Sequence, residues 1–470
     1  MSKIILVWAG GTWMSAIAGI LHKLNFKNLV CIDANQSQIT DNLQSMWIDV
    51  IIWHGKYKVH EWDAVIYSEA VVESPEVVEA KQIAESYSKA MLVMNYFQFL
   101  GEISKYFVTV GFTWTNGKSS CTSLAIYSAY KCLPGFWLGI VWALVGDFDN
   151  KNYLVNENYK EDINQIFEFI FNGKKLPYDL VKKYLFVVEA CEYKRHFLHL
   201  DLDYACISSL ELDHTDYYKD WSDYVSAFTQ LIRNVRKNVF VAESLKNISE
   251  IQDEKNIYVK TQSFYLKYIW GRNRQANASL VYNVLSQVQK DGFEINDVDL
   301  AWSFADFKWL RRRMEYLWES KNWALIYSDY GHVASSIAFG YENLKEKYPG
   351  KKISVIFQPH QIARILMNRN EFVESFKWYE KVCIYDIYAA RERIEDYKEQ
   401  MQNIAHLSDG KVSDLVSFWN VFAEHCGGKY LVDFDEVKWI LDGIWSDEIL
   451  IFFSAWDLDY KVRKVIKLKD

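Results

Sequence analysis

Short runs of apolar residues alternate with amphipathic stretches along most of the chain. In the first hundred residues, the runs "KIILVWAG", "NLVCIDA" and "AVIYSEAV" have the length and composition of strands. The stretches between them, such as "MSAIAGILHKL", place apolar residues at helical spacing. This alternation predicts a parallel sheet whose strands are joined by crossover helices.

The same rhythm begins again twice. "YFVTVGF" at residues 106–112 opens a second series, and "WALIYSDYGH" at residues 323–332 opens a third. We therefore predict an α/β fold with three domains. They are an N-terminal Rossmann-like domain over residues 1–104, a central P-loop ATPase-like domain over residues 105–315 and a C-terminal Rossmann-like domain over residues 316–470.

Composition narrows the class of protein. Seven scattered cysteines without a C-x-x-C pair argue against a disulfide framework and a structural zinc site. The net charge of −8 disfavours nucleic-acid binding through a basic face. No apolar run approaches the roughly 20 residues that span a bilayer, and "MSKIILVWAGG" lacks the features of a signal peptide. We expect a cytoplasmic protein with no membrane insertion, and the sequence leaves its oligomeric state open.

The segment "TWTNGKSS", residues 113–120, has the character of a phosphate-binding loop between a strand and a helix. Amide N–H groups at the helix start would face phosphate oxygens, an exposed Lys118 would supply a cation, and Ser119 would ligate magnesium. The strict G-x-x-x-x-G-K-[ST] spacing is absent, because Gly111 comes one position too early. An ordinary turn before a helix is the alternative.

A second candidate loop lies near the N-terminus, in "LVWAGGTWMSAIA". With glycine in place of Trp8 and Trp13, this segment would read G-x-G-x-x-G, the fingerprint of loops that bind dinucleotides or pyrophosphate. A coincidental turn at Gly10 and Gly11 is the alternative.

Polar residues at predicted strand ends are further candidates. Glu189 and His214 follow strands beside the phosphate loop, where they are placed to hold a divalent metal ion. The alternative is a surface glutamate and a hydrogen-bonded loop histidine. Further along the chain, Arg311, Arg312 and Arg313 are candidates for contacting a phosphate, and a solvated face is the alternative. The last candidates, at strand ends of the third domain, are Asp329, His332, His360 and Arg364.

In this order, the segments resemble the Mur ligase family of ATP-dependent amide-forming enzymes, and most closely its alanine-adding branch. "VWAGGTWMSAIA" is similar to the branch's G-I-G-G-x-G-M-S, and "TWTNGKSS" to the family's T-G-T-N-G-K-[ST]-[ST]. "FVVEACEYKRHFL" resembles E-A-[DC]-E-[YR]-x-R-x-F, "LRRRME" resembles R-R-R-F-E, and "FQPHQIAR" resembles F-Q-P-H-x-x-[ST]-R. The resemblance runs nearly from end to end.

The resemblance implies ATP and Mg²⁺ as cofactors and UDP-N-acetylmuramate and L-alanine as substrates, coupled through an acyl phosphate. The implied catalytic residues are Lys118, Glu189, His214, Arg312, Arg313, His360 and Arg364, with Ser119, Glu189 and His214 holding the metal. The implied ATP site comprises Thr113, Thr115, Asn116, Gly117, Lys118, Ser119, Ser120, Asn277 and Asp329. The implied UDP site, in the N-terminal domain, comprises Gly10, Gly11, Met14, Ser15, Asp33 and Ser68.

Several positions depart from the alanine-adding pattern. Asn116 replaces its usual histidine, Val333 follows His332 where a second histidine is usual, and Gln361 replaces an arginine. Thr229 stands where other branches carry a carbamoylated lysine, which favours the alanine-adding branch. The alternatives are a sibling ligase that adds another amino acid or a peptide, and a non-catalytic nucleotide-binding homologue.

Glycine is scarce in this chain and tryptophan is abundant. The chain has 20 glycines and 19 tryptophans, whereas average glycine usage of about 7% predicts roughly 33 glycines. Tryptophan stands at family glycine positions 8, 13, 114 and 456, and in turn-like places at 47, 53, 142, 309 and 318, whereas Trp62 and Trp221 look ordinary. We hypothesise that the gene uses UGA for glycine and that this codon was read as tryptophan. The alternative is a genuine tryptophan-rich, inactivated homologue.

Overall fold

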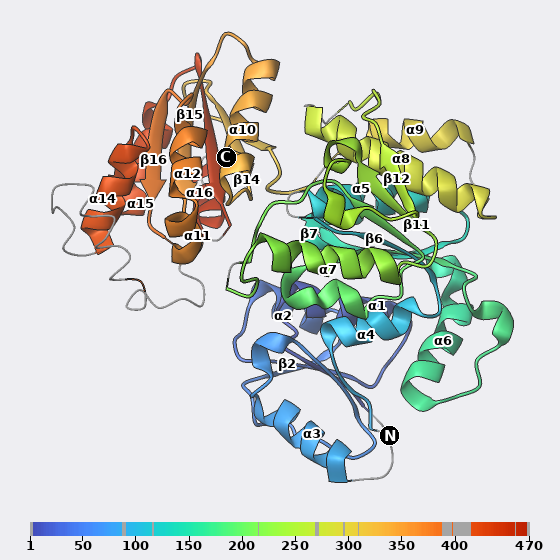
Figure 1. The fold of residues 1–470 in the computed structure, drawn as a ribbon. Helices are drawn as coiled ribbons and strands as arrows, with labels where there is room; N and C mark the ends of the chain where they lie inside the picture. The colour runs from blue at the N-terminus through green and yellow to red at the C-terminus, as the bar shows by residue number, and fades with distance from the viewer. Residues whose placement is uncertain are drawn as a thin grey trace. The chain divides into compact units, whose positions relative to one another are not determined.

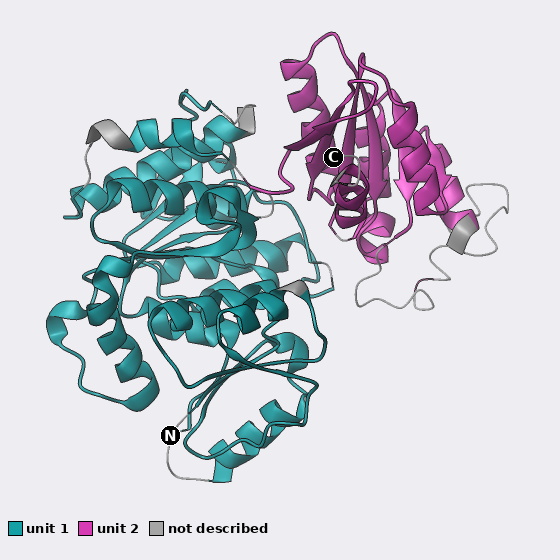
Figure 2. Cartoon of the chain, turned by 180° about the vertical axis from the view of Figure 1, so that it is seen from behind, with its two compact units in different colours: residues 1–269, 273–309 teal, residues 270–272, 310–470 magenta. Residues whose placement is uncertain are grey.

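The chain forms two compact units in the computed structural model (Figure 2). Unit 1 comprises residues 1–269 and 273–309, and unit 2 comprises residues 270–272 and 310–470. The structure describes residues 3–86, 91–114, 117–214, 216–267, 272–294, 297–308, 310–387, 397, 415–455 and 457–467.

Unit 1 begins with a five-stranded sheet in the order β3-β2-β1-β4-β5, in which every pairing is parallel (Figure 1). Its strands are β1 (Ile4–Val7), β2 (Leu29–Asp33), β3 (Asp49–Ile52), β4 (Ala64–Tyr67) and β5 (Val93–Asn95). Its helices are α1 (Thr12–Lys23), α2 (Gln38–Ser45), η1 (Glu69–Val71), α3 (Pro75–Ser86) and α4 (Tyr96–Ser104). Ser37 and Asn95 form capping boxes at the starts of α2 and α4.

The second sheet of unit 1 has seven strands in the order β12-β11-β10-β6-β9-β7-β8, with only the β7–β8 pair antiparallel. Its strands are β6 (Val108–Phe112), β7 (Phe136–Val145), β8 (Lys151–Val155), β9 (Leu185–Glu189), β10 (Tyr204–Ile207), β11 (Asn238–Ala242) and β12 (Asn256–Val259). The α-helices are α5 (Lys118–Cys132), α6 (Lys160–Asn172), α7 (Trp221–Asn234), α8 (Arg272–Lys290) and α9 (Asp297–Asp306). The 3-10 turns are η2 (Gly146–Phe148), η3 (Glu157–Tyr159), η4 (Tyr178–Leu180), η5 (Tyr193–His199), η6 (Glu243–Leu245) and η7 (Ser249–Ile251).

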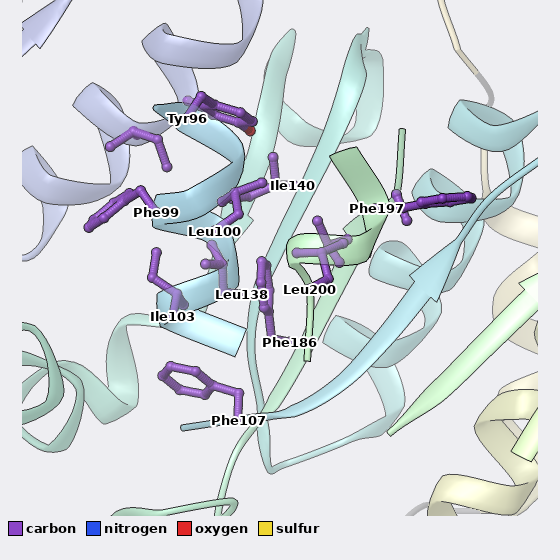
Figure 3. Packing of buried hydrophobic residues seen from close by; sticks show 14 of the residues in the cluster. Tyr96, Phe99, Leu100, Ile103, Phe107, Leu138, Ile140, Phe186, Phe197 and Leu200 are labelled. Carbon is purple, nitrogen blue, oxygen red and sulfur yellow. The ribbon is translucent and has the colours of Figure 1, made fainter. Parts of the chain in front are cut away.

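A shared apolar core joins these two sheets. Phe99 and Leu100 of α4 belong to the same buried cluster as Leu138 of β7 and Phe186 of β9 (Figure 3). Residues of the first sheet's helices therefore bury their apolar faces against the second sheet, which explains why both sheets form one unit. The domain boundaries expected at residues 104 and 315 remain predictions.

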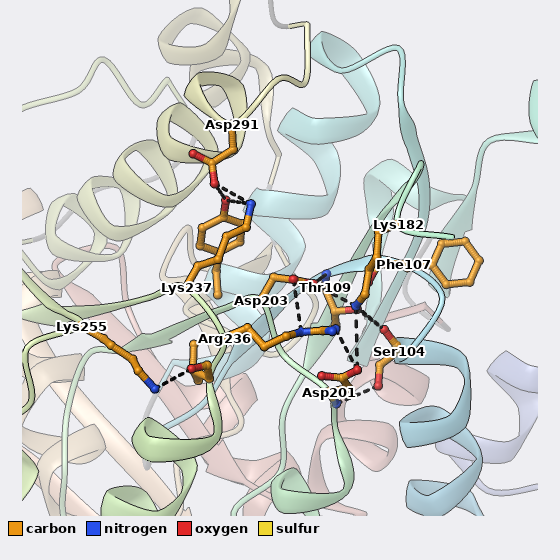
Figure 4. A network of polar contacts seen from close by, with 12 residues as sticks. Ser104, Phe107, Thr109, Lys182, Asp201, Asp203, Arg236, Lys237, Lys255 and Asp291 are labelled. Atoms are coloured by element: carbon orange, nitrogen blue, oxygen red, sulfur yellow. Dashed lines mark hydrogen bonds and ion pairs between the residues drawn. The ribbon is translucent and has the colours of Figure 1, made fainter. Parts of the chain in front are cut away.

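Polar contacts hold the amino ends of the second sheet's strands (Figure 4). Asp203, just before β10, accepts a hydrogen bond of 2.9 Å from the backbone N–H of Thr109 in β6 and pairs with Lys182 at 3.1 Å. Arg236, just before β11, pairs with Asp201 at 2.8 Å. These contacts occupy one edge of the sheet, so the carboxyl ends of the same strands remain for the candidate site.

Unit 2 is a single six-stranded sheet in the order β13-β14-β18-β15-β16-β17, parallel except for the edge strand β13. Its strands are β13 (Glu315–Glu319), β14 (Leu325–Asp329), β15 (Lys352–Gln358), β16 (Lys381–Tyr385), β17 (Lys429–Leu431) and β18 (Glu448–Ser454). The helices are α10 (Ala334–Lys347), α11 (Ile362–Met367), α12 (Arg369–Phe376), α14 (Leu415–His425), α15 (Phe434–Gly443) and α16 (Leu458–Lys467). The predicted α/β fold class is confirmed.

Two absences concern the described residues. None of the described helices is both long and apolar enough to cross a membrane. None of the seven cysteines, all of which are buried within the described ranges, forms a disulfide.

Four of the tryptophans that the structure describes have a left-handed backbone. The φ angles are 72° at Trp8, 63° at Trp47, 83° at Trp53 and 65° at Trp323. This conformation costs little for glycine, but it is a genuine outlier for a bulky side chain. The Trp47 indole is 96% exposed, so no packing contact explains its presence there. The backbone at these positions therefore has the conformation of glycine.

Two expectations about tryptophan were wrong. Trp142 and Trp318 lie in strands β7 and β13, not in turns. Both nevertheless occur where strand pairing changes register, between Ile140 and Val145 in β7 and between Tyr316 and Trp318 in β13. Glycine in a strand often marks such a bulge, which is why the local sequence resembled a turn. Trp309 and Trp456 lie outside the described residues.

We expect the codons of these tryptophans to fall into two classes. Under the misreading hypothesis, TGA encodes positions 8, 13, 114 and 456, and the backbone now adds positions 47, 53 and 323. Trp62 and Trp221 should be encoded by TGG, which makes them internal controls. Sequencing the gene tests this directly, and TGG at every one of these positions would refute the hypothesis.

Candidate functional site

The loop between β6 and α5 depends on a glycine. Gly117 has a φ of 101° and directly precedes α5. A Cβ atom there would lie 3.3 Å from both Asn277 Nδ2 and Trp114 Nε1, so both the conformation and the space favour glycine. The first turn of α5 follows, and its amide N–H groups lack partners within the helix and can bind an anion.

Trp114 occupies the interior of this loop. Its side chain is fully buried, and its Nε1 has no hydrogen-bond partner among the residues that the structure describes. The hydroxyl of Thr113 is also buried without a partner in that part of the chain, and Ser120 is buried as well. Thr115 and Asn116 lie outside the described residues. The loop therefore holds an indole in the space that the sequence assigns to phosphate.

Lys118 is held by a buried carboxylate. Its Nζ donates to Glu192 Oε1 at 2.7 Å and to the carbonyl oxygen of Trp114 at 2.6 Å. Burial alone lowers the pKa of Lys118, but the adjacent Glu192, together with Cys191 and Glu189, raises it above the usual value. The prediction of an exposed lysine was wrong, because only 12% of the Lys118 side chain is accessible. The charged form of Lys118 depends on this counter-ion.

Sequence reasoning missed Glu192 as a site residue. The Glu192 side chain is fully buried, and its Oε2 has no partner among the described residues. Burial alone raises the pKa of Glu192, but Lys118 and His214 lower it below the usual value, which favours the carboxylate. The signal was present in "EACEY", where Glu192 follows Glu189 by three residues.

Ser119 and Glu189 form the second polar pair of the site. The Ser119 hydroxyl donates to Glu189 Oε1 at 3.1 Å, and the backbone N–H of Trp142 donates to Glu189 Oε2 at 2.8 Å. A hydroxyl and a carboxylate fit Mg²⁺, which takes one or two protein oxygens together with phosphate oxygens and water. No cluster of three or more His, Cys, Asp or Glu side chains that could hold a metal occurs in the described ranges.

His214 contacts Glu192. Its Nε2 lies 3.5 Å from Glu192 Oε1 and 4.0 Å from Asp213 Oδ2. Burial alone lowers the pKa of His214, but Asp213 and Glu192 raise it above the usual value. A raised pKa favours the protonated imidazole, so this arrangement favours a positively charged group beside Lys118. A protonated imidazole cannot coordinate a metal ion. The assignment of His214 as a metal ligand remains a prediction.

We expect the contribution of His214 to the free energy of unfolding to decrease as the pH rises. A raised folded-state pKa contributes stability that is fully present below the unfolded pKa of about 6.5 and is lost as pH rises through the folded pKa. The free energy of unfolding of the unsubstituted protein should therefore exceed that of the His214→Gln variant, and the difference should be larger at about pH 6 than at about pH 9. Denaturant titrations of both proteins measure this, and a difference that does not vary with pH would contradict it.

The predicted UDP-site residues gather at the carboxyl ends of neighbouring strands β1, β2 and β4. The backbone N–H of Gly10 donates to Asp33 Oδ2 at 2.8 Å. A Cβ atom on Gly11 would lie 2.7 Å from Trp8 Cδ1, so the Trp8 indole presses on this loop. The Ser68 hydroxyl accepts a hydrogen bond of 3.3 Å from the N–H of Ala70.

Two of the predicted UDP-site residues have side chains engaged elsewhere. Met14 is fully buried in the core, so only its backbone can line the loop. The Ser15 hydroxyl donates to the carbonyl oxygen of Thr12 at 2.9 Å within α1. The contribution of both residues to the UDP site remains a prediction.

Unit 2 brings together its own candidates. Asp329, at the end of β14, accepts hydrogen bonds from Gly331 N at 2.6 Å and from Met314 N at 2.7 Å. Arg364 Nη1 lies 3.0 Å from His360 Nδ1, and the rings of His360 and His332 are 5.5 Å apart.

The two arginines of the predicted phosphoryl site also lie in unit 2. Arg312 donates to the carbonyl oxygen of Ser454 and lies 3.8 Å from Asp459. The guanidinium of Arg313 lies over the Tyr330 ring, 5.1 Å from its centroid. Arg312 is therefore held within this unit by a carbonyl and a carboxylate.

Comparison with known proteins agrees with these features. Residues 113–298 match the family model of the Mur ligase middle domain. UDP-N-acetylmuramate-L-alanine ligases from the Loch Maree and Langeland strains of Clostridium botulinum are 28% identical over 421 residues, covering 83% of this chain and 84% of theirs.

Two of the solved structures that resemble this chain are ligases. UDP-N-acetylmuramate-alanine ligase from Thermotoga maritima has a TM-score of 0.69 at 17% identity, covering 100% of this chain and 99% of its own. A murein peptide ligase from Psychrobacter arcticus has a TM-score of 0.59 at 14% identity, covering 99% and 98%. At these identities the two structures show a shared fold, and the family-model match assigns residues 113–298 to the Mur ligase middle domain.

Proposed function

We propose that this protein is an ATP-dependent ligase that joins L-alanine to UDP-N-acetylmuramate in peptidoglycan synthesis. The observation that supports this most directly is the pairing of Lys118 with Glu192, and of Ser119 with Glu189, at a helix start after a parallel strand. The two Clostridium botulinum relatives are named for this activity, and their similarity to this protein covers 83% of its chain.

The phosphate loop would bind and orient the triphosphate. The first turn of α5 offers amide N–H groups, and Lys118 offers a cation that can turn from the carbonyl oxygen of Trp114 to a phosphate oxygen. Ser119 and Glu189 would hold Mg²⁺, which supplies charge neutralisation for the phosphoryl group that is transferred. The carboxylate of UDP-N-acetylmuramate would attack the γ-phosphorus of ATP, giving an acyl phosphate and ADP.

Unit 2 would complete the second step. The amine of L-alanine attacks the acyl phosphate carbon, and phosphate leaves after a tetrahedral intermediate carrying an oxyanion. The guanidinium of Arg364 is the proposed group for stabilising that charge, since its 3.0 Å contact with His360 fixes its direction. Asp329 is proposed to bind the ribose of ATP, and Arg312 or Arg313 to face its phosphates.

A sibling activity is the second candidate. The residue after His360 is Gln361, with a φ of 68°, where the alanine-adding pattern has arginine. A changed residue in an unusual backbone conformation beside the proposed catalytic pair would alter the pocket for the amino acid. This observation favours testing other amino acids alongside L-alanine.

We expect phosphate release only when UDP-N-acetylmuramate, ATP and L-alanine are present together. The assay uses the protein with its tryptophans in place and a form with glycine at positions 8, 13 and 114, with each candidate amino acid or peptide in turn. Release with a different amino acid or a peptide would identify a sibling ligase. No release by either form would favour a non-catalytic homologue and would refute the proposed function.

A further inference from the structure

Two indoles meet between the two loops of unit 1. The ring centroids of Trp13 and Trp142 are 4.7 Å apart, with an angle of 44° between their planes. The ring centroids of Tyr96 and Phe97 lie 5.0 and 5.4 Å from that of Trp13, in T-shaped arrangements. The four rings form a compact aromatic cluster at the start of α1.

Each indole is attached to one of the two candidate sites. Trp13 is the second residue of α1, directly after the loop that contains Gly10 and Gly11. Trp142 donates its backbone N–H to Glu189 at 2.8 Å, and the same carboxylate accepts from Ser119. A continuous line of contacts therefore runs from the N-terminal loop through both indoles to the phosphate-loop serine.

The backbone around this contact is firmly positioned. Asn152 of β8 donates a hydrogen bond to the carbonyl oxygen of Thr12 at the start of α1. Further along α1, a Cβ atom on Gly19 would lie 2.2 Å from the Tyr153 hydroxyl oxygen, so the helix packs directly on the β7–β8 pair. The indoles cannot separate by a simple movement of α1, because these contacts hold it against β8.

We propose that Trp13 and Trp142 form a steric barrier between the two sites. The inference rests on the proposed function, in which one substrate reaches from the N-terminal loop, where its UDP binds, to a carboxylate beside Ser119 and Glu189. The sugar of that substrate must lie between the loops, where the indoles touch. A nucleoside diphosphate alone ends before this point.

The geometry favours a barrier over a platform on which a sugar ring stacks. Trp13 packs against Trp142, Tyr96 and Phe97 and so presents no open ring face, and Trp142, which is 43% exposed, is fixed on Trp13 and occupies solvent-accessible space. Trp142 also lies in the segment where the β7–β8 register shifts, a place that suits a residue without a side chain.

The test compares two ligands on a matched set of full-length proteins. The parent carries Trp8→Gly, which removes the indole that presses on Gly11. Trp142→Gly, Trp142→Ala and Trp13→Gly are added singly, and Trp62→Gly is the control because Trp62 is exposed and lies in another part of unit 1. Calorimetry measures the affinity for UDP and for UDP-N-acetylmuramate, and circular dichroism verifies folding.

A barrier predicts different outcomes for the two ligands. Trp142→Gly and Trp142→Ala should leave the affinity for UDP within about twofold and raise that for UDP-N-acetylmuramate by about tenfold or more. Weaker sugar-nucleotide binding would indicate a platform, and unchanged binding would remove any role; either overturns the barrier while the proposed function stands. If no protein binds UDP or its sugar derivative, the proposed function fails together with the barrier.

Discussion

Replacing Trp8, Trp13 and Trp114 with glycine is expected to recover nucleotide binding at both loops of unit 1. Trp114 is fully buried inside the phosphate loop and its Nε1 lies close to Gly117, so a triphosphate and this indole compete for the same space. Trp8 has a φ of 72° and presses on Gly11 in the other loop. Trp13 follows that loop in α1.

Calorimetry with ATP and with UDP-N-acetylmuramate measures the recovery. Trp114→Gly alone should strengthen ATP binding by at least about tenfold, because phosphate oxygens can then approach the amide N–H groups at the start of α5. Trp62→Gly and Trp221→Gly are matched controls, since neither residue lies in a candidate loop. Equal ATP affinity in the unsubstituted protein and in Trp114→Gly would show that the indole does not obstruct the site.

Removing the amine of Lys118 is the second large effect. In the form with glycine at positions 8, 13 and 114, Lys118→Ala should lower turnover by about 10²–10³-fold, because it removes a cation that neutralises charge on the transferred phosphoryl group. Steady-state phosphate release measures this. Near-normal turnover would exclude the loop from the mechanism.

Because Lys118 is buried and paired in the structure, Lys118→Ala should also lower the free energy of unfolding. Glu192 is fully buried and pairs with Lys118 at 2.7 Å, so the substitution leaves a buried charge that, among the described residues, His214 partly neutralises. Breaking a buried pair in this way costs about 3–5 kcal/mol. The double variant Lys118→Ala with Glu192→Gln should regain much of that stability while turnover stays low, which separates the catalytic role from the structural one.

The sequence by itself determined the features that depend on neighbouring residues. Alternation of apolar runs with helical spacing predicted the α/β fold, and the strand, the glycine and the helix around residues 105–127 predicted the phosphate loop. Both signals are local, because side-chain periodicity and backbone requirements of glycine act within a few residues. For the same reason, the sequence around positions 8 and 53 already indicated glycine, in conflict with the tryptophans found there.

Only the tertiary structure decided which distant residues meet. Glu192 reaches Lys118 because β9 lies beside β6 in the sheet, and strand order depends on packing over the whole unit. The contact of Trp13 with Trp142 requires α1 of one sheet to pack on β7 and β8 of another. Burial of Met14 and of Lys118 is likewise a property of the assembled core. Local sequence restricts each segment's conformation, whereas the free energy that brings segments together comes from apolar surface shared across the fold.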